Sequence, residues 1–127
     1  MKAATLAMMV LMGFAGVQAS ADQAKIVEIR VSDVIVPGGF DSNSDAYVIE
    51  TGMFPNGCYG WASAQVTNLP DNVTEIRSFA VVRPGLCPMV LIPFHKEVRL
   101  GRMTKGTHSL RFMNTDGTYL EETMTIE

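Results

Sequence analysis

Apolar and polar residues alternate along most of the chain. Residues 27–31 place valine and isoleucine at every second position between charged residues, and residues 47–51 place tyrosine, isoleucine and threonine on one face. A period of two sends successive side chains to opposite faces of a strand, which is typical of half-buried β-strands. No window of comparable length repeats with the 3.6-residue period of a helix. The pattern therefore predicts an all-β protein.

Turn-forming residues divide this pattern into about seven short strands. Pro37-Gly38-Gly39 ends the first strand, and Asn114-Thr115-Asp116-Gly117 is the strongest hairpin signal in the chain. Strands separated by turns every 8–12 residues or so are typical of a two-sheet sandwich. We therefore expect a single small antiparallel β-sandwich. Its predicted strands are residues 27–31, with 34–36 as a candidate extension, then 47–51, 59–67, 73–82, 98–100, 107–113 and 118–126.

Residues 83–94 break the alternation, because Pro84, Pro88 and Pro93 each remove a backbone hydrogen-bond donor. The last six of these residues, Met89-Val90-Leu91-Ile92-Pro93-Phe94, include five apolar side chains beside Pro93. A central strand does not tolerate proline, so we expect this run to lie at the edge of a sheet.

The N-terminal residues are typical of an export signal. Met1-Lys2 supplies a positive charge, residues 3–17 are almost wholly apolar, and small residues at 17–21 offer a signal-peptidase site. The apolar run is too short for a transmembrane helix, which needs about 20 apolar residues. We expect a cleaved signal peptide over residues 1–21, one β-sandwich domain over 22–127, and a bacterial periplasmic or secreted location. No insertion of the mature chain into a membrane is expected.

The charge of the exported chain argues against a polyanionic partner. Loss of residues 1–21 removes one of ten Lys and Arg residues and none of thirteen Asp and Glu residues, leaving 9 − 13 = −4. A mildly acidic domain has no electrostatic attraction to nucleic acid or to an anionic membrane.

Cys58 and Cys87 are the two cysteines of the chain, and both follow the export signal. An isolated pair in an exported protein is most simply a disulfide, here tying the proline-broken segment to the turn before residue 59. Two free thiols, redox-active or metal-binding, are the alternative. The pair lacks the Cys-x-x-Cys spacing of redox sites, and no histidine is near either cysteine in the sequence.

The stretch from Gly52 to Trp61 contains a Pro-Asn-Gly turn, Cys58 and the single tryptophan of the chain. A large aromatic carried inward by a strand is a principal core residue. We expect that role for Trp61. The rival interpretation is an exposed aromatic surface made by Trp61 with Phe54 and Tyr59.

Residues 98–112, Val-Arg-Leu-Gly-Arg-Met-Thr-Lys-Gly-Thr-His-Ser-Leu-Arg-Phe, are followed by Asp116-Gly117. This run resembles the last two strands of bacterial immunoglobulin-like and fibronectin-type domains. In those families a leucine and a glycine precede an alternating strand opened by a tyrosine, and here His108 stands at the tyrosine position. The resemblance implies an immunoglobulin-like sandwich and names no activity.

Catalytic chemistry has little support in the sequence. A nucleophilic site needs a histidine beside a nucleophile, and the chain has only His95 and His108. We expect His95 in an exposed turn and the ring nitrogens of His108 bonded to local backbone. The pair Glu121-Glu122 alternates to opposite faces of a strand and cannot converge on one bond. No enzymatic activity and no cofactor are expected, and a small hydrolase is a distant alternative.

A periplasmic copper carrier is the second hypothesis. Thioether sulfur is a soft donor suited to Cu(I), and Met89, Met103 and Met113 with His95 or His108 supply candidate ligands. These methionines are scattered singly along the sequence, which favours a packing role. No metal ligand is therefore assigned from the sequence.

The leading hypothesis is a non-enzymatic interaction module of the cell envelope, which binds a protein or envelope component, or a second copy, through loops or a sheet edge. Exposed apolar residues of the proline-broken segment and of the turn near Cys58 are the candidate surface. These residues are Met89, Val90, Leu91, Ile92, Phe94, Phe54 and Tyr59.

Overall fold

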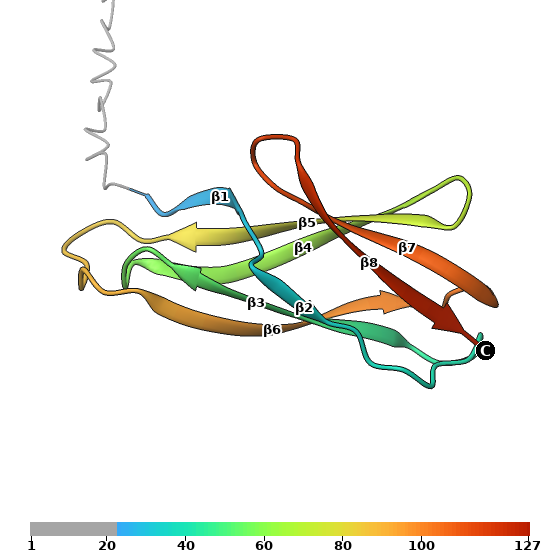
Figure 1. Cartoon of the computed structure of the whole chain (residues 1–127). Helices are drawn as coiled ribbons and strands as arrows, with labels where there is room; N and C mark the ends of the chain where they lie inside the picture. The colour runs from blue at the N-terminus through green and yellow to red at the C-terminus, as the bar shows by residue number, and fades with distance from the viewer. Residues whose placement is uncertain (1–22) are drawn as a thin grey trace, which may run out of the picture.

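The computed structural model describes residues 23–127, so the proposed signal peptide lies outside the described residues. The described chain is all-β and forms two sheets that face each other (Figure 1). Its eight strands are β1 (Lys25–Ile29), β2 (Asp33–Ile35), β3 (Ala46–Phe54), β4 (Tyr59–Leu69), β5 (Val73–Val82), β6 (Ile92–Gly101), β7 (Gly106–Met113) and β8 (Tyr119–Ile126). The predicted small β-sandwich is confirmed.

β5 is the central strand of the five-stranded sheet. It pairs along its whole length with β4, while its C-terminal half pairs with β1 and its N-terminal half pairs with β7. β8 continues the sheet beyond β7. The apolar second half of β5 fits this position, because a strand with neighbours on both sides and a sheet on its inner face has little contact with water.

One strand pair differs from the expected antiparallel pattern, since β5 and β7 run parallel. The chain leaves β5, crosses to the other sheet as β6 and then returns as β7. Because the chain reverses its direction twice, β7 runs the same way as β5. The contact also joins β7 to the turn before β5, where the Ser109 N–H donates to the Asn72 carbonyl at 2.9 Å.

The second sheet has three strands in the order β2-β3-β6. Residues 34–36 do not extend the first strand, because the chain crosses between the sheets after Ile29 and β2 pairs with β3. β6 begins at Ile92, six residues before the expected start at Val98. Pro93 is tolerated in this strand because β6 pairs only with β3 and forms an edge. Ile92, Pro93 and Phe94 lie on this edge strand as predicted, whereas Met89, Val90 and Leu91 precede it in the β5–β6 connection and belong to no strand.

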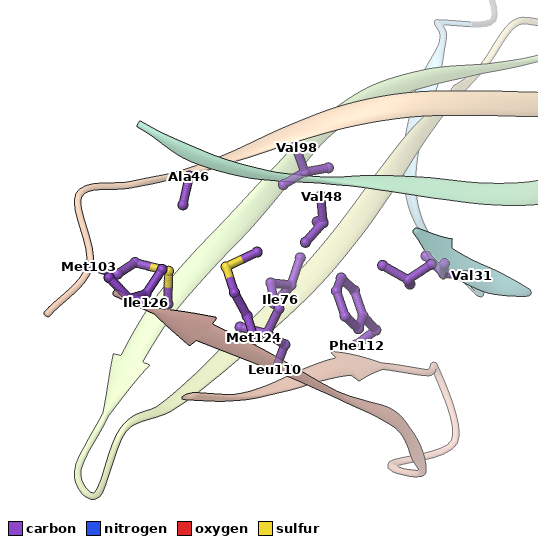
Figure 2. Packing of buried hydrophobic residues seen from close by; sticks show 11 residues of the cluster. Val31, Ala46, Val48, Ile76, Val98, Met103, Leu110, Phe112, Met124 and Ile126 are labelled. Atoms are coloured by element: carbon purple, nitrogen blue, oxygen red, sulfur yellow. The ribbon is translucent and has the colours of Figure 1, made fainter. Parts of the chain in front are cut away.

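The core consists of two apolar clusters, each built from both sheets. The larger cluster includes Val48, Ile76, Phe112 and Met124 (Figure 2). The smaller cluster contains Ile29, Phe54, Ala80 and Phe94.

A polar layer of Glu50, Ser78 and Trp61 lies between these clusters. Along β3, Glu50 stands between Val48 of the larger cluster and Phe54 of the smaller one. Ser78 has the matching place in β5, between Ile76 and Ala80. Trp61 of β4 packs against both clusters, and the exposed Lys96 of β6 lies over its ring.

Candidate functional site

The connection between β5 and β6, residues 83–91, is fastened to the turn between β3 and β4, and we call it the tethered loop. The predicted disulfide is present between Cys58 and Cys87, with the two Cα atoms 5.2 Å apart. The loop forms the left end of the molecule in Figure 1. A covalent tie at this point holds a segment whose prolines prevent it from completing a strand ladder.

Backbone hydrogen bonds reinforce the disulfide on both sides. The Gly57 N–H donates to the Pro88 carbonyl at 2.9 Å, and the Arg83 N–H donates to the Cys58 carbonyl at 2.9 Å. Pro88 packs directly over Gly57, where an added Cβ would lie 2.7 Å from the proline Cδ. The tethered loop is therefore held in one conformation at several points.

Apolar side chains of the tethered loop project into solvent. The relative exposure is 104% for Leu86, 83% for Met89, 57% for Val90 and 66% for Leu91. Single exposed apolar residues are ordinary, but here four of six consecutive residues are both apolar and exposed. Leu86 extends the surface predicted from Met89, Val90 and Leu91.

The four other residues of the predicted surface, Phe54, Tyr59, Ile92 and Phe94, lie in or against the smaller core cluster. Phe54 and Phe94 are buried in the smaller core cluster, where their rings stack with centroids 4.5 Å apart. Phe94 turns inward because Gly52, its partner across the β3–β6 ladder, leaves room for its ring. Tyr59 is half-buried against the same cluster. The assignment of Phe54 and Phe94 to a binding surface is therefore wrong.

The edge of β6 carries charges where the tethered loop carries apolar groups. Ile92 is half-buried, and His95, Lys96, Glu97 and Arg99 are exposed. His95 lies within the strand and not in the expected turn. Charged side chains on an edge strand oppose pairing with another strand. The loop is thus a better docking element than the edge.

Two cations lie at the start of the tethered loop, Arg83 within it and Lys25 beside it. Lys25 and Arg83 line a depression with Gln23, Val82, Pro84 and Gly85. The end of the sandwich that presents the apolar loop therefore also presents positive charge.

The polar layer contains a carboxyl group with no solvent exposure. Ser78 Oγ donates to Glu50, at 2.7 Å from each carboxylate oxygen. Burial raises the pKa of Glu50, and the Ser78 hydroxyl partly offsets this effect. The indole N–H of Trp61 acts in the same direction as Ser78, although Trp61 Nε1 has no hydrogen-bond partner among the described residues. We attribute the lowering of the Glu50 pKa by Trp61 to the dipole of its indole N–H.

Trp61 is a half-buried member of the core and does not make a free aromatic surface. It packs against both apolar clusters. The Nζ atom of Lys96 lies 5.0 Å from the centroid of its ring. Lys96 is also the direct partner of Glu50 across the β3–β6 ladder, so Glu50, Trp61 and Lys96 are neighbours at this level of the sandwich.

An open pocket of about 210 Å³ lies between the β4–β5 turn and the β6–β7 connection. Its lining brings together Met103 and His108, two of the candidate metal ligands. His108 Nε2 lies 2.6 Å from the Thr104 carbonyl oxygen, as expected for a histidine that satisfies local backbone. His95 is exposed on β6, Met113 is half-buried on β7, and Met89 is in the tethered loop.

Sequence reasoning missed Met124 and Glu50. Met124 lies directly across the β7–β8 ladder from His108. The Asn114–Gly117 hairpin signal could have predicted that register, since the turn fixes which residues face each other. Nothing in the local sequence distinguishes Glu50 from a solvent-facing glutamate.

The comparisons with known proteins place the fold. The chain belongs to the ORF11 beta-sandwich domain family, whose model matches residues 48–126, from within β3 to the end of β8. No curated protein and no solved structure matches the chain. Across residues 23–127, no helix is long and apolar enough to cross a membrane. In the same range, no three His, Cys, Asp or Glu side chains gather as a metal site.

Proposed function

We propose that the mature chain is a non-enzymatic interaction module of the bacterial cell envelope, which binds a protein partner through the tethered loop. The observation that carries this proposal is the exposure of four apolar side chains within six residues of the tethered loop, Leu86, Met89, Val90 and Leu91. Water contact with these side chains is unfavourable, so their burial in a partner contributes about 25 cal/mol per Å² of apolar area.

The fastening of the loop supports binding. A segment held by the Cys58–Cys87 disulfide and by backbone bonds loses less conformational entropy on association than a free loop would. The disulfide also supports an exported location, periplasmic or secreted, because such bonds persist in oxidising compartments.

A protein partner fits the charges better than a lipid surface does. Lys25 and Arg83 are two cations, whereas recognition of anionic lipid typically uses clusters of about 4–8. The net charge of −4 expected for the mature chain also opposes an anionic membrane. The partner we propose has an apolar socket that receives Leu86 and Met89, with carboxylates at its rim.

Two further parts of the proposal concern the type of β-sandwich and whether the protein is an enzyme. The resemblance of residues 98–112, which span the end of β6 and most of β7, supports an immunoglobulin-like type of sandwich. The roles of the histidines support a non-enzymatic function. His95 is exposed on an edge strand, and His108 is bonded to the Thr104 carbonyl, so neither is seen activating a nucleophile.

Site-specific photocrosslinking tests the proposal. A photoreactive residue is placed at Leu86 or Met89 in the mature protein, and a matched one at Ile35, which is 52% exposed on β2. We expect a discrete protein adduct from envelope extract at the two loop positions and none at Ile35.

Lysine substitution supplies the decisive comparison. Leu86→Lys and Leu91→Lys should abolish the adduct formed through Met89, while Ile35→Lys should leave it unchanged. Equal adduct yield from all three variants would overturn the proposal. Loop-dependent binding to protein-free vesicles, without a protein adduct, would also overturn it.

A further inference from the structure

At the other end of the sandwich, two neutral soft or borderline donors line the open pocket, and a third lies directly across the β7–β8 ladder from one of them. Met103 and His108 both line this pocket. Met124 is the partner of His108 across the β7–β8 ladder, and both side chains face inward. Directly opposed residues have Cβ atoms about 4.5–5.5 Å apart, so the thioether of Met124 is within reach of the imidazole.

The sulfur atoms of both methionines belong to the same space between the sheets. Met103 and Met124 are members of the larger core cluster, with exposures of 8% and 2%. Figure 2 shows both side chains projecting between the layers. Methionine has three rotatable bonds, so each sulfur can be re-aimed toward a shared ligand without a backbone shift.

The tautomer of His108 leaves one nitrogen available. The Thr104 carbonyl oxygen can only accept, so the Nε2 atom at 2.6 Å carries the proton and donates. In the neutral ring, Nδ1 then bears the free lone pair. No residue from 23 to 127 donates to Nδ1 in the structure. An N–H held by a backbone carbonyl is the usual way that proteins orient a metal-binding imidazole.

We propose that Met103, His108 and Met124 form a binding site for Cu(I). Thioethers select soft ions, and imidazole suits copper. The three donors are neutral, so the occupied site would carry only the single positive charge of Cu(I). Zn²⁺ instead favours thiolate, imidazole and carboxylate donors. Arg102 also lines the pocket, but it is exposed and its repulsion is screened by solvent.

This site is independent of the tethered loop. The pocket adjoins the N-terminal end of β5, whereas the loop follows its C-terminal end, and β5 has ten residues. A ten-residue strand spans roughly 30 Å. Loss of either activity therefore leaves the other unaffected.

Titration with Ag(I), a redox-inert substitute for Cu(I), tests the site in the mature protein. Ag(I) needs no reductant, so the Cys58–Cys87 disulfide stays intact and supplies no thiol ligand. We expect one ion per chain, a raised Tm, and shifts of the Met103 and Met124 methyl signals and of His108 Nδ1 in NMR spectra. Binding without these three shifts would overturn the proposal.

Volume-conserving variants separate ligation from packing. Met103→Leu and Met124→Leu keep the core filled. Each should weaken Ag(I) binding about tenfold or more, because loss of a direct ligand costs at least as much as loss of its outer-shell support. Met89→Leu and His95→Gln change exposed residues of the same types and should bind as the parent does. Unchanged affinity in both core variants would overturn the proposal, as would loss of affinity in either control.

Discussion

Ser78 Oγ lies 2.7 Å from both carboxylate oxygens of Glu50, and this contact joins the two sheets in the middle of the sandwich. Glu50 belongs to the three-stranded sheet and Ser78 to the five-stranded sheet. The buried Glu50 carboxyl group has lost its contact with water, and the Ser78 hydroxyl replaces that water as a hydrogen-bond donor. The stability of the core therefore depends on the protonation state of Glu50.

The first prediction is that Glu50 makes the protein less stable as the pH rises. Burial raises the folded-state pKa of Glu50 above its ordinary value of 4.5. Between these two pKa values the folded chain holds a proton that the unfolded chain has released, so the free energy of unfolding falls with increasing pH. The contribution is fully present below about pH 4.5 and is lost as the pH rises through the folded-state value.

Denaturant unfolding from pH 4 to 8 measures this effect. Glu50→Gln removes the titrating group and should flatten the profile, so the variant gains stability relative to the parent as the pH rises. If parent and Gln variant show the same pH dependence, Glu50 does not titrate differently in the folded and unfolded states.

The second prediction concerns the Cys58–Cys87 disulfide, which closes a loop with a sequence separation of 29. On the chain-entropy model, closing such a loop stabilises the protein by about 3.5 kcal/mol. Reduction should lower the free energy of unfolding by about that amount and increase amide hydrogen exchange in the tethered loop. Intact mass with and without reductant and alkylation verifies the bond, and alkylation of both cysteines in the unreduced protein would contradict it.

The sequence predicted most of the strands because alternation and turn chemistry are local. Residues 73–82, 107–113 and 118–126 match β5, β7 and β8 within one residue at each end. The Asn114–Gly117 turn and the unbroken β-prone run of β5 carry their own signals. Cysteine pairing was also predictable, since two cysteines permit one intramolecular bond.

Burial was harder to predict because it depends on residues distant in the sequence. Phe94 is apolar and follows a proline, and it is buried because Gly52, about forty positions earlier, leaves space for its ring. Likewise, residues 47–51 alternate correctly, but the inward face of β3 is the one that carries Glu50. Because Glu50 is charged, the hydrophobic pattern does not identify the face that carries it as the buried one.

The third prediction tests this long-range packing. An added Cβ at Gly52 would lie 2.5 Å from two carbons of the Phe94 ring. Gly52→Ala should therefore displace the ring and destabilise the protein by about 1–3 kcal/mol. Gly38→Ala is the matched control, since an added Cβ there has no neighbour within 4 Å, and it should change stability by less than about 0.5 kcal/mol. Equal effects of the two substitutions in denaturant unfolding would contradict the packing argument.

The last prediction is that Lys96 keeps the edge of β6 from pairing with another chain. Lys96 lies on the same face of β6 as the buried Phe94 and Val98 but is itself exposed, and its ammonium group lies over the Trp61 ring. A lysine on an edge strand opposes a second strand, because pairing would bury its charge without a partner. Lys96→Val should therefore increase self-association with protein concentration, measured by size-exclusion chromatography with light scattering. Lys105→Val removes the same charge from the β6–β7 connection and should leave the oligomeric state of the parent. Identical behaviour of both valine variants would show that the charge at position 96 does not protect the edge.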